Sequence, residues 1–165
     1  MRRDIYLLTG TNLGDRRRNL QQAGNMLKIR GVEIISSSLL YETASWGVGD
    51  QPDYLNQVLH VGSTMTPMEL LAEIQQIELA MGRERKKKWE SRIIDIDILL
   101  FGNLVLDTPS LKVPHPEIQN RRFTLVPLGE IAPGYIHPVF GKTISQLLEE
   151  CVDDLSVSAI PLLAK

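Results

Sequence analysis

The sequence has little cysteine, few aromatic residues and no long apolar run. Its single cysteine, Cys151, cannot form a disulfide within the chain, so folding does not require an oxidising compartment. No segment approaches the roughly 20 apolar residues of a membrane span, and the first apolar run, residues 5–8, is too short for a secretory signal. We therefore expect a cytoplasmic protein that has no membrane partner.

The chain also lacks an excess of charge of either sign. Its formal net charge is -2 over 165 residues, which gives no global electrostatic reason to bind nucleic acid, so any anion site must be local. Hydrophobic residues make up 43% of the chain, an ordinary globular value. We expect residues 1–165 to form a single domain with one core, and we expect a monomer.

The order of secondary-structure signals predicts an α+β fold. Helical patterns follow the N-caps expected at Asp15 and Thr66 and end at Gly31 and Gly82. Four segments have the character of strands, and with the helices they give the order βαββαβ of a ferredoxin-like antiparallel sheet with two helices on one face. These strand segments are residues 4–10, 32–41, 54–63 and 92–101.

A C-terminal helical and hairpin extension is expected beyond this unit. Gly102 and Asn103 predict a tight turn into a short hairpin partner at residues 104–107. Two further helices are expected, at residues 124–131 and 143–151.

Two acids interrupt the apolar segment "RIIDIDILLF", residues 92–101. Strand alternation puts Asp95 and Asp97 together on one face, roughly 6 to 7 Å apart, where both carboxylates can hold the same hard cation or a pair of cations. The alternative is a solvent-exposed face that carries charges for solubility. The other face is apolar and holds Ile94, Ile96, Ile98 and Leu100.

A basic segment, "RERKKKWESR" at residues 83–92, lies directly before these acids. Arginine forks match phosphate oxygens, so cations next to a metal site favour a polyphosphate such as a nucleotide. Taken alone, a run of charges is more often a solvated loop. The chain has no Walker loop, so any ATP site must be built differently.

The few aromatic residues, 5% of the chain, stand near polar residues. Trp46 lies in the long loop before Tyr54, and Phe123 closes "VPHPEIQNRRF", which contains His115. Rings of this kind, with Asn56 nearby, can hold a flat heterocycle by stacking and edge hydrogen bonds. For each ring singly, burial in the core is the alternative.

The segments "GTNLGD", "DQPDYLN", "RIIDIDILLFGN" and "VPHPEIQNRRF", in this order and spacing, resemble 6-hydroxymethyl-7,8-dihydropterin pyrophosphokinases of folate biosynthesis. The resemblance covers nearly the whole chain. It implies direct transfer of the pyrophosphoryl group of ATP to the hydroxymethyl oxygen of the pterin, which releases AMP and uses two Mg²⁺ ions.

The resemblance also implies roles for individual residues. Asp95 and Asp97 match the metal ligands, and Arg83 and Arg92 match the arginines most closely tied to catalysis. The positions that match the pterin site are Thr43, Ala44, Trp46, Tyr54, Asn56, Asp95 and Phe123. The positions that match the ATP site are Gln75, Glu78, Arg83, Arg85, Lys86, Trp89, Arg92, Ile98, His115 and Arg121.

Two places depart from the family pattern. Ser45 stands where the family commonly has proline, and Glu90 and Ser91 in "WESR" stand where it commonly has glycine and proline. Neither change affects the metal ligands or the stacking rings.

Other functions are compatible with parts of this pattern. A two-metal nucleotidyl transferase would share the paired aspartates, but it would need a basic surface for its template. A ferredoxin-like RNA-binding module would need aromatic residues on its strands. A relative that binds pterin or nucleotide without turnover also stays possible.

Overall fold

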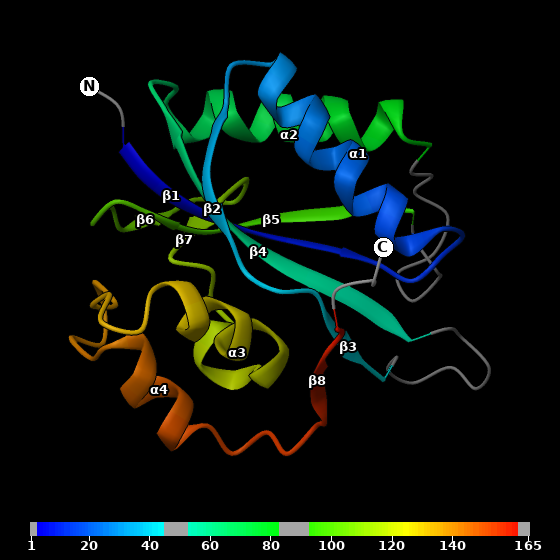
Figure 1. Cartoon of the computed structure of the whole chain (residues 1–165). Helices are drawn as coiled ribbons and strands as arrows, with labels where there is room; N and C mark the ends of the chain where they lie inside the picture. Colours follow the sequence, from blue (N-terminus) through cyan, green and yellow to red (C-terminus); the bar gives the residue numbers. More distant parts are fainter. Residues whose placement is uncertain (1–2, 45–52, 83–92, 162–165) are drawn as a thin grey trace.

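The computed structural model describes residues 3–44, 53–82 and 93–161 of the chain. Its main sheet has six strands in the order β5–β1–β4–β3–β8, and β2 also pairs with β4 (Figure 1). Every pairing in this sheet is antiparallel. The strands are β1 (Arg3–Thr11), β2 (Glu33–Ser37), β3 (Tyr41–Thr43), β4 (Tyr54–Ser63), β5 (Asp95–Phe101) and β8 (Val157–Ala159).

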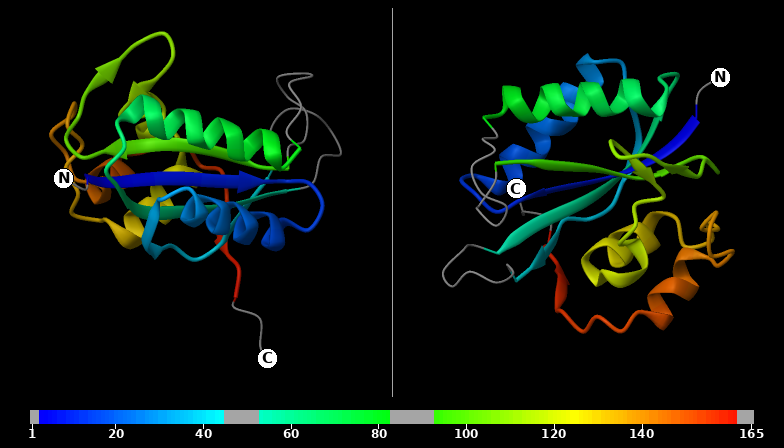
Figure 2. Two further views of the ribbon diagram at one scale, coloured as in Figure 1. Left: turned by 90° about the horizontal axis from the view of Figure 1, so that it is seen from above. Right: turned by 180° about the vertical axis from the view of Figure 1, so that it is seen from behind.

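Helices lie on both sides of the sheet. The helices α1 (Arg16–Ile29) and α2 (Pro67–Ala80) cover one face, as expected for a ferredoxin-like fold (Figures 1 and 2). The extension contributes α3 (Arg122–Ile131) and α4 (Ile144–Glu150), which lie against the other face. The sheet therefore separates two clusters of buried side chains, where composition alone suggested one core.

The helix ends follow the sequence signals. Asp15 caps α1, and Thr66 forms a capping box with Glu69 at the start of α2. Gly31 and Gly82 follow these helices with φ angles of 89° and 88°, a conformation that glycine adopts without strain. No described helix is long and apolar enough to cross a lipid bilayer.

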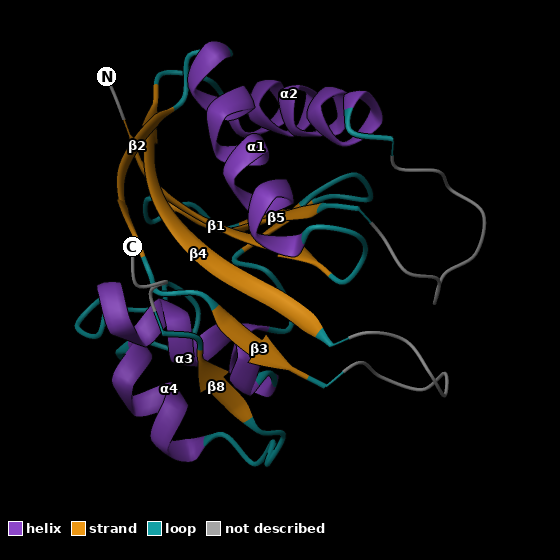
Figure 3. Ribbon diagram, turned by 45° about the vertical axis from the view of Figure 1, so that its right-hand side comes forward, coloured by secondary structure: helices purple, strands orange, loops and turns teal. Residues whose placement is uncertain are grey.

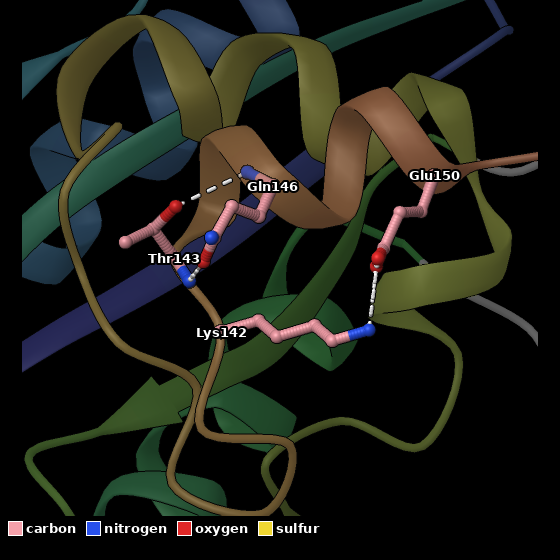
Figure 4. A network of polar contacts seen from close by, with 4 residues as sticks. All are labelled: Lys142, Thr143, Gln146 and Glu150. Atoms are coloured by element: carbon pink, nitrogen blue, oxygen red, sulfur yellow. Dashed lines mark hydrogen bonds and ion pairs between the residues drawn. The ribbon is translucent and has the colours of Figure 1, made fainter.

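The last helix, α4, has its own capping box and an ion pair beside it (Figure 4). The Thr143 hydroxyl accepts from the Gln146 N–H at 3.1 Å, and the Gln146 side chain accepts from the Thr143 N–H at 2.8 Å. Lys142 donates to the Glu150 carboxylate at 2.8 and 2.9 Å. These contacts are exposed, so the ion pair adds little to stability.

The alternation expected along β5 holds only as far as Ile98. The β1–β5 register shifts between Tyr6 and Leu7, which pair with Leu100 and Ile98, so Leu99 is an extra residue in a β-bulge. Both Leu99 and Leu100 consequently pack on the α3 side of the sheet. The prediction that Leu100 continues the face of Ile96 and Ile98 was therefore wrong.

The prediction of a hairpin after β5 was also wrong. Residues of the predicted partner form β6 (Leu106–Asp107), which pairs with β7 (Lys112–Val113) in a separate two-stranded sheet. The outer side of β5 is taken by the chain after β7, because the His115 N–H donates to the Leu99 carbonyl at 2.9 Å. This segment occupies the place where the hairpin partner was expected.

The strand predicted at residues 32–41 is two strands, β2 and β3. Between them the Ser38 N–H donates to the Val58 carbonyl at 2.9 Å, while the Ser38 hydroxyl accepts from the Val58 N–H at 3.0 Å. A side-chain oxygen thus replaces a main-chain carbonyl in the ladder, which interrupts the strand. The sequence did not predict β8.

Candidate active site

A row of four residues crosses the sheet near one end of its strands. Asp95 of β5 pairs with Gly10 of β1, Gly10 pairs with Asn56 of β4, and Asn56 pairs with Tyr41 of β3. Paired residues project from the same side of a sheet, and neighbouring strands are about 4.8 Å apart. Asp97 belongs to this same side, since its partner Leu8 packs in the α3-side cluster.

Because Gly10 has no side chain, the row has a gap between Asp95 and Asn56, which we call the slot. A Cβ atom at Gly10 would meet the Asn56 side-chain amide at 3.4 to 3.6 Å, so any side chain here would narrow the slot. The Oδ1 atom of Asn56 is buried, and it accepts no hydrogen bond from any described residue. A buried carbonyl without a donor is costly, which makes this atom suited to a ligand N–H.

Four of the predicted pterin residues lie in this row or next to it. Thr43 of β3 pairs directly with Tyr54 of β4, two positions along from Asn56, and both Thr43 and Asn56 are 4% exposed. Phe123 lies in the first turn of α3, which packs against β3 and β4 (Figure 3). The structure thus brings Thr43, Tyr54, Asn56 and Asp95 together on the face that α3 covers.

A second group of predicted residues lies beside Asp97. Burial is the main effect on His115 and lowers its pKa, and the positive charge of Arg121 lowers it further. The negative charges of Asp97 and Glu117 act in the opposite direction, but the pKa stays below its usual value. The His115 Nδ1 atom accepts from the Glu117 N–H at 3.1 Å, so the neutral ring carries its proton on Nε2. The side chain can therefore donate a hydrogen bond to a phosphate oxygen.

Arg121 also lies over the ring of Phe123, one of the predicted pterin residues. Its Cζ atom lies 5.6 Å from the centre of the Phe123 ring, which is a cation–π arrangement. One residue thereby links the predicted nucleotide contacts to the predicted pterin contacts.

Two predicted nucleotide residues lie on or next to β5, and a third lies on α2. Glu78 of α2 is 6% exposed, and its carboxylate accepts from the main-chain N–H of Ile96 at 3.0 Å. Gln75, one turn earlier on α2, is exposed. The side chain of Ile98 is buried on the α1 and α2 side, as strand alternation predicted, which leaves its main chain to reach a nucleotide.

The two aspartates suit a hard divalent cation. Asp95 and Asp97 are half-buried on one face, and among the described residues no cluster of three or more histidine, cysteine or acidic side chains could hold a metal by itself. Mg²⁺ characteristically takes one or two protein carboxylates together with waters and substrate phosphates. This donor set therefore fits Mg²⁺ better than a metal held in a closed protein cage.

Several predicted positions lie outside the described residues. These are Trp46 of the pterin set, and Arg83, Arg85, Lys86, Trp89 and Arg92 of the ATP set, with the departures Ser45, Glu90 and Ser91. Ala44 is described and exposed at the end of β3.

Sequence reasoning missed the importance of Gly10. We expected it only as the last residue of the strand at residues 4–10, and the structure places it inside β1, which extends to Thr11. A glycine inside a strand often marks the close approach of a ligand, and this is the signal that could have identified it.

Comparison with known proteins shows the family to which the chain is similar. The family model described as 7,8-dihydro-6-hydroxymethylpterin-pyrophosphokinase (HPPK) matches residues 6–133. A relative from Aquifex aeolicus named 2-amino-4-hydroxy-6-hydroxymethyldihydropteridine pyrophosphokinase is 40% identical over 146 residues, which cover 88% of this chain and 91% of that protein. A relative of the same name from Pseudomonas aeruginosa is 38% identical over 148 residues, covering 89% and 91%.

Longer proteins contain a matching region. The folic acid synthesis protein fol1 of Pneumocystis carinii is 35% identical over 98% of this chain, which spans 22% of that protein. The crystal structure of Plasmodium falciparum HPPK-DHPS with pteroate has the same fold, with a TM-score of 0.74 and 18% identity; the match covers 91% of this chain and 42% of that one. With its family model matched over most of its length, this chain belongs to the 7,8-dihydro-6-hydroxymethylpterin-pyrophosphokinase family.

Proposed function

We propose that this chain transfers the pyrophosphoryl group of ATP to the hydroxymethyl oxygen of 6-hydroxymethyl-7,8-dihydropterin. The products are AMP and the pterin diphosphate, an intermediate of folate biosynthesis. Membership of the family supports this activity. The structural observation that carries it is the slot at Gly10, which has a carboxylate on one side and the buried Asn56 carbonyl on the other.

The slot suits a flat heterocycle with N–H groups along its edge. In this proposal the Asn56 Oδ1 atom accepts from the pterin edge and Thr43 adds a polar contact. Tyr54 and Phe123 stack on the two faces of the ring, and stacking of flat rings adds to the gain from their burial. Trp46 and Ala44 are included among the proposed pterin contacts only because they match positions of the family.

ATP is the co-substrate, and its phosphates are proposed to lie between Asp97 and the basic residues. Asp95 and Asp97 would hold two Mg²⁺ ions, which when bound neutralise phosphate charge and polarise the attacking hydroxyl. His115 donates from Nε2 and Arg121 supplies a fixed positive charge. Gln75, Glu78 and the main chain of Ile98 stay predictions for the nucleoside end.

The reaction asks for alignment and charge neutralisation rather than covalent chemistry by side chains. The hydroxymethyl oxygen forms a bond to the β phosphorus, and the bond from that phosphorus to the oxygen on the α phosphate breaks, so AMP leaves. Stacking between Tyr54 and Phe123 would hold the pterin in line. Arg83 and Arg92 are predicted to stabilise the charge that develops in this step.

A product assay tests this function. Purified protein with Mg²⁺, ATP and fresh 6-hydroxymethyl-7,8-dihydropterin should form AMP and pterin diphosphate in equal amounts. ADP as the product would contradict pyrophosphoryl transfer, and pterin binding without AMP would indicate a relative that does not turn over. A monomeric state and a cytoplasmic location stay predictions.

A further inference from the structure

The strand that carries Thr43 is short and receives support from α3. β3 has only three residues, Tyr41–Thr43, and lies between β4 and β8. The carboxylate of Glu130 accepts a hydrogen bond from the Tyr41 hydroxyl and also accepts from the Leu39 N–H at 3.1 Å. We call these contacts the Glu130 clamp. Tyr41 is 8% exposed, so this phenol is held inside the structure.

The clamp joins two parts of the site through one helix. Phe123 is in the first turn of α3 and Glu130 in its last turn, which are about 10 Å apart along a regular helix. Tyr41 pairs directly with Asn56, and Thr43 lies two residues after Tyr41. A shift of α3 relative to β3 would therefore change the distance between Phe123 and the polar edge of the slot.

A second contact holds β3 on its opposite face. The Arg16 guanidinium of α1 lies 2.6 Å from the Glu42 carboxylate and donates to the Asp53 carbonyl at 2.9 Å. Glu42 stands between Tyr41 and Thr43, so its side chain projects to the other side of the strand. α1 thus holds β3 on one side, and the Glu130 clamp ties it on the other side to the helix that carries Phe123.

We propose that Glu130 is a positioning residue for the pterin site, which acts through Tyr41 to set the separation between Phe123 and the row of Asn56 and Thr43. This inference rests on the proposed function, because it assigns the slot to the pterin. Glu130 itself does not touch the substrate. Glu130 instead raises the fraction of protein molecules in which the slot is wide enough for the pterin ring.

The test separates pterin binding from ATP binding. If loss of the clamp leaves about a tenth of the molecules with a correctly spaced slot, the apparent Kd for pterin rises about tenfold. We expect this rise in Tyr41→Phe and in Glu130→Ala by isothermal calorimetry, with the Kd of a non-hydrolysable ATP analogue changed less than about twofold. Tyr41→Phe removes one hydroxyl and keeps the ring, so it guards against a variant that fails to fold.

The matched control is Glu150→Ala, which removes a carboxylate from the exposed ion pair with Lys142 on α4. It should leave the Kd for both ligands unchanged. The double variant Tyr41→Phe/Glu130→Ala should weaken pterin binding by less than the product of the single effects, because both changes break one contact.

Several outcomes would overturn the inference. A lower melting temperature with an unchanged pterin Kd would make the clamp purely structural. If the clamp variants weaken the binding of pterin and of the ATP analogue equally, the clamp is not selective for the pterin site. The same conclusion follows if Glu150→Ala weakens pterin binding as much as they do. If the wild-type protein binds no pterin, the proposed function fails and the inference fails with it; normal wild-type binding with unaffected variants would overturn the inference alone.

Discussion

The carboxylate of Glu78 on α2 accepts a hydrogen bond from the main-chain N–H of Ile96, the residue between Asp95 and Asp97. β5 is the edge strand of the sheet, so this N–H has no strand partner on its outer side. Glu78 satisfies it from the helix layer and thereby fixes the main chain between the two acids. A position that the sequence assigns to ATP thus also supports the strand that carries the proposed metal ligands.

Removal of this acceptor should destabilise the protein. We expect Glu78→Ala to lower the free energy of unfolding by about 1–3 kcal/mol, because a buried N–H loses its partner, whereas Glu78→Gln keeps a carbonyl acceptor and costs less. Urea unfolding measures the difference. Glu73→Ala is the control on the same helix, since its ion pair with Arg30 is partly exposed and worth less than about 1 kcal/mol. Equal losses in both variants would contradict a special role for Glu78.

Replacement of Asp97 should remove activity and preserve the fold. Asp97→Asn keeps the size of the side chain and loses the charge that would bind Mg²⁺, so we expect kcat to fall by about 10²-fold or more. The AMP assay gives the rate, and circular dichroism checks the fold. Asp107→Asn removes an exposed carboxylate 3.7 Å from Lys112 on the separate small sheet and should leave the rate unchanged. A near-normal rate in Asp97→Asn would mean that the aspartates are surface charges.

A methyl group can be placed in the slot by the substitution Gly10→Ala. In Gly10→Ala the new Cβ meets the Asn56 amide at 3.4 Å, so the KM for pterin should rise while the KM for ATP stays close to that of the wild type. Gly24→Ala on α1 introduces the same group at 3.4 Å from the Ile34 side chain of β2, away from the site. If both variants have normal pterin KM, the slot is not the pterin site.

His137 should make stability depend on acidic pH. Its Nδ1 atom accepts from the Val139 and Phe140 N–H groups, both at 3.2 Å, and burial lowers its pKa below the usual 6.5. Unfolded chains then take up a proton more readily than folded ones, so this contribution is complete above pH 6.5 and is lost as pH falls below that value. The free energy of unfolding should therefore drop more between pH 7 and pH 5 in the wild type than in His137→Asn. Equal drops would contradict this.

The sequence predicted the local features of the fold well. The strand at residues 54–63 was predicted with the bounds that the structure has, and the caps at Asp15 and Thr66 are present, because these depend on neighbouring residues. Alternation alone put Asp95 and Asp97 on one face. It also misplaced Leu100, because no local signal marks the extra residue Leu99 in the bulge.

Contacts between distant parts of the chain could not be predicted. The Glu130 clamp joins residues 89 to 91 positions apart, and the pairing of β8 with β3 joins the last described strand to an early one. Strand alternation suggested the metal role of Asp95 and Asp97, whereas most of the other residue roles came from the resemblance to a family. Asn56 was a candidate from the sequence because it stands near aromatic residues, and the structure adds a stronger reason in its buried Oδ1 atom.

The bulge at Leu99 shifts the alternation of side chains, so the second half of β5 does not follow the pattern of the first half. Up to Ile98 the strand alternates acids with apolar residues, and beyond the bulge both Leu99 and Leu100 serve the core beneath α3. A strand with strict alternation would have given that core only one of the two leucines. Mutations in the second half can therefore change the packing under α3 without turning the carboxylates of the first half to the other side of the sheet, provided that the extra residue is kept.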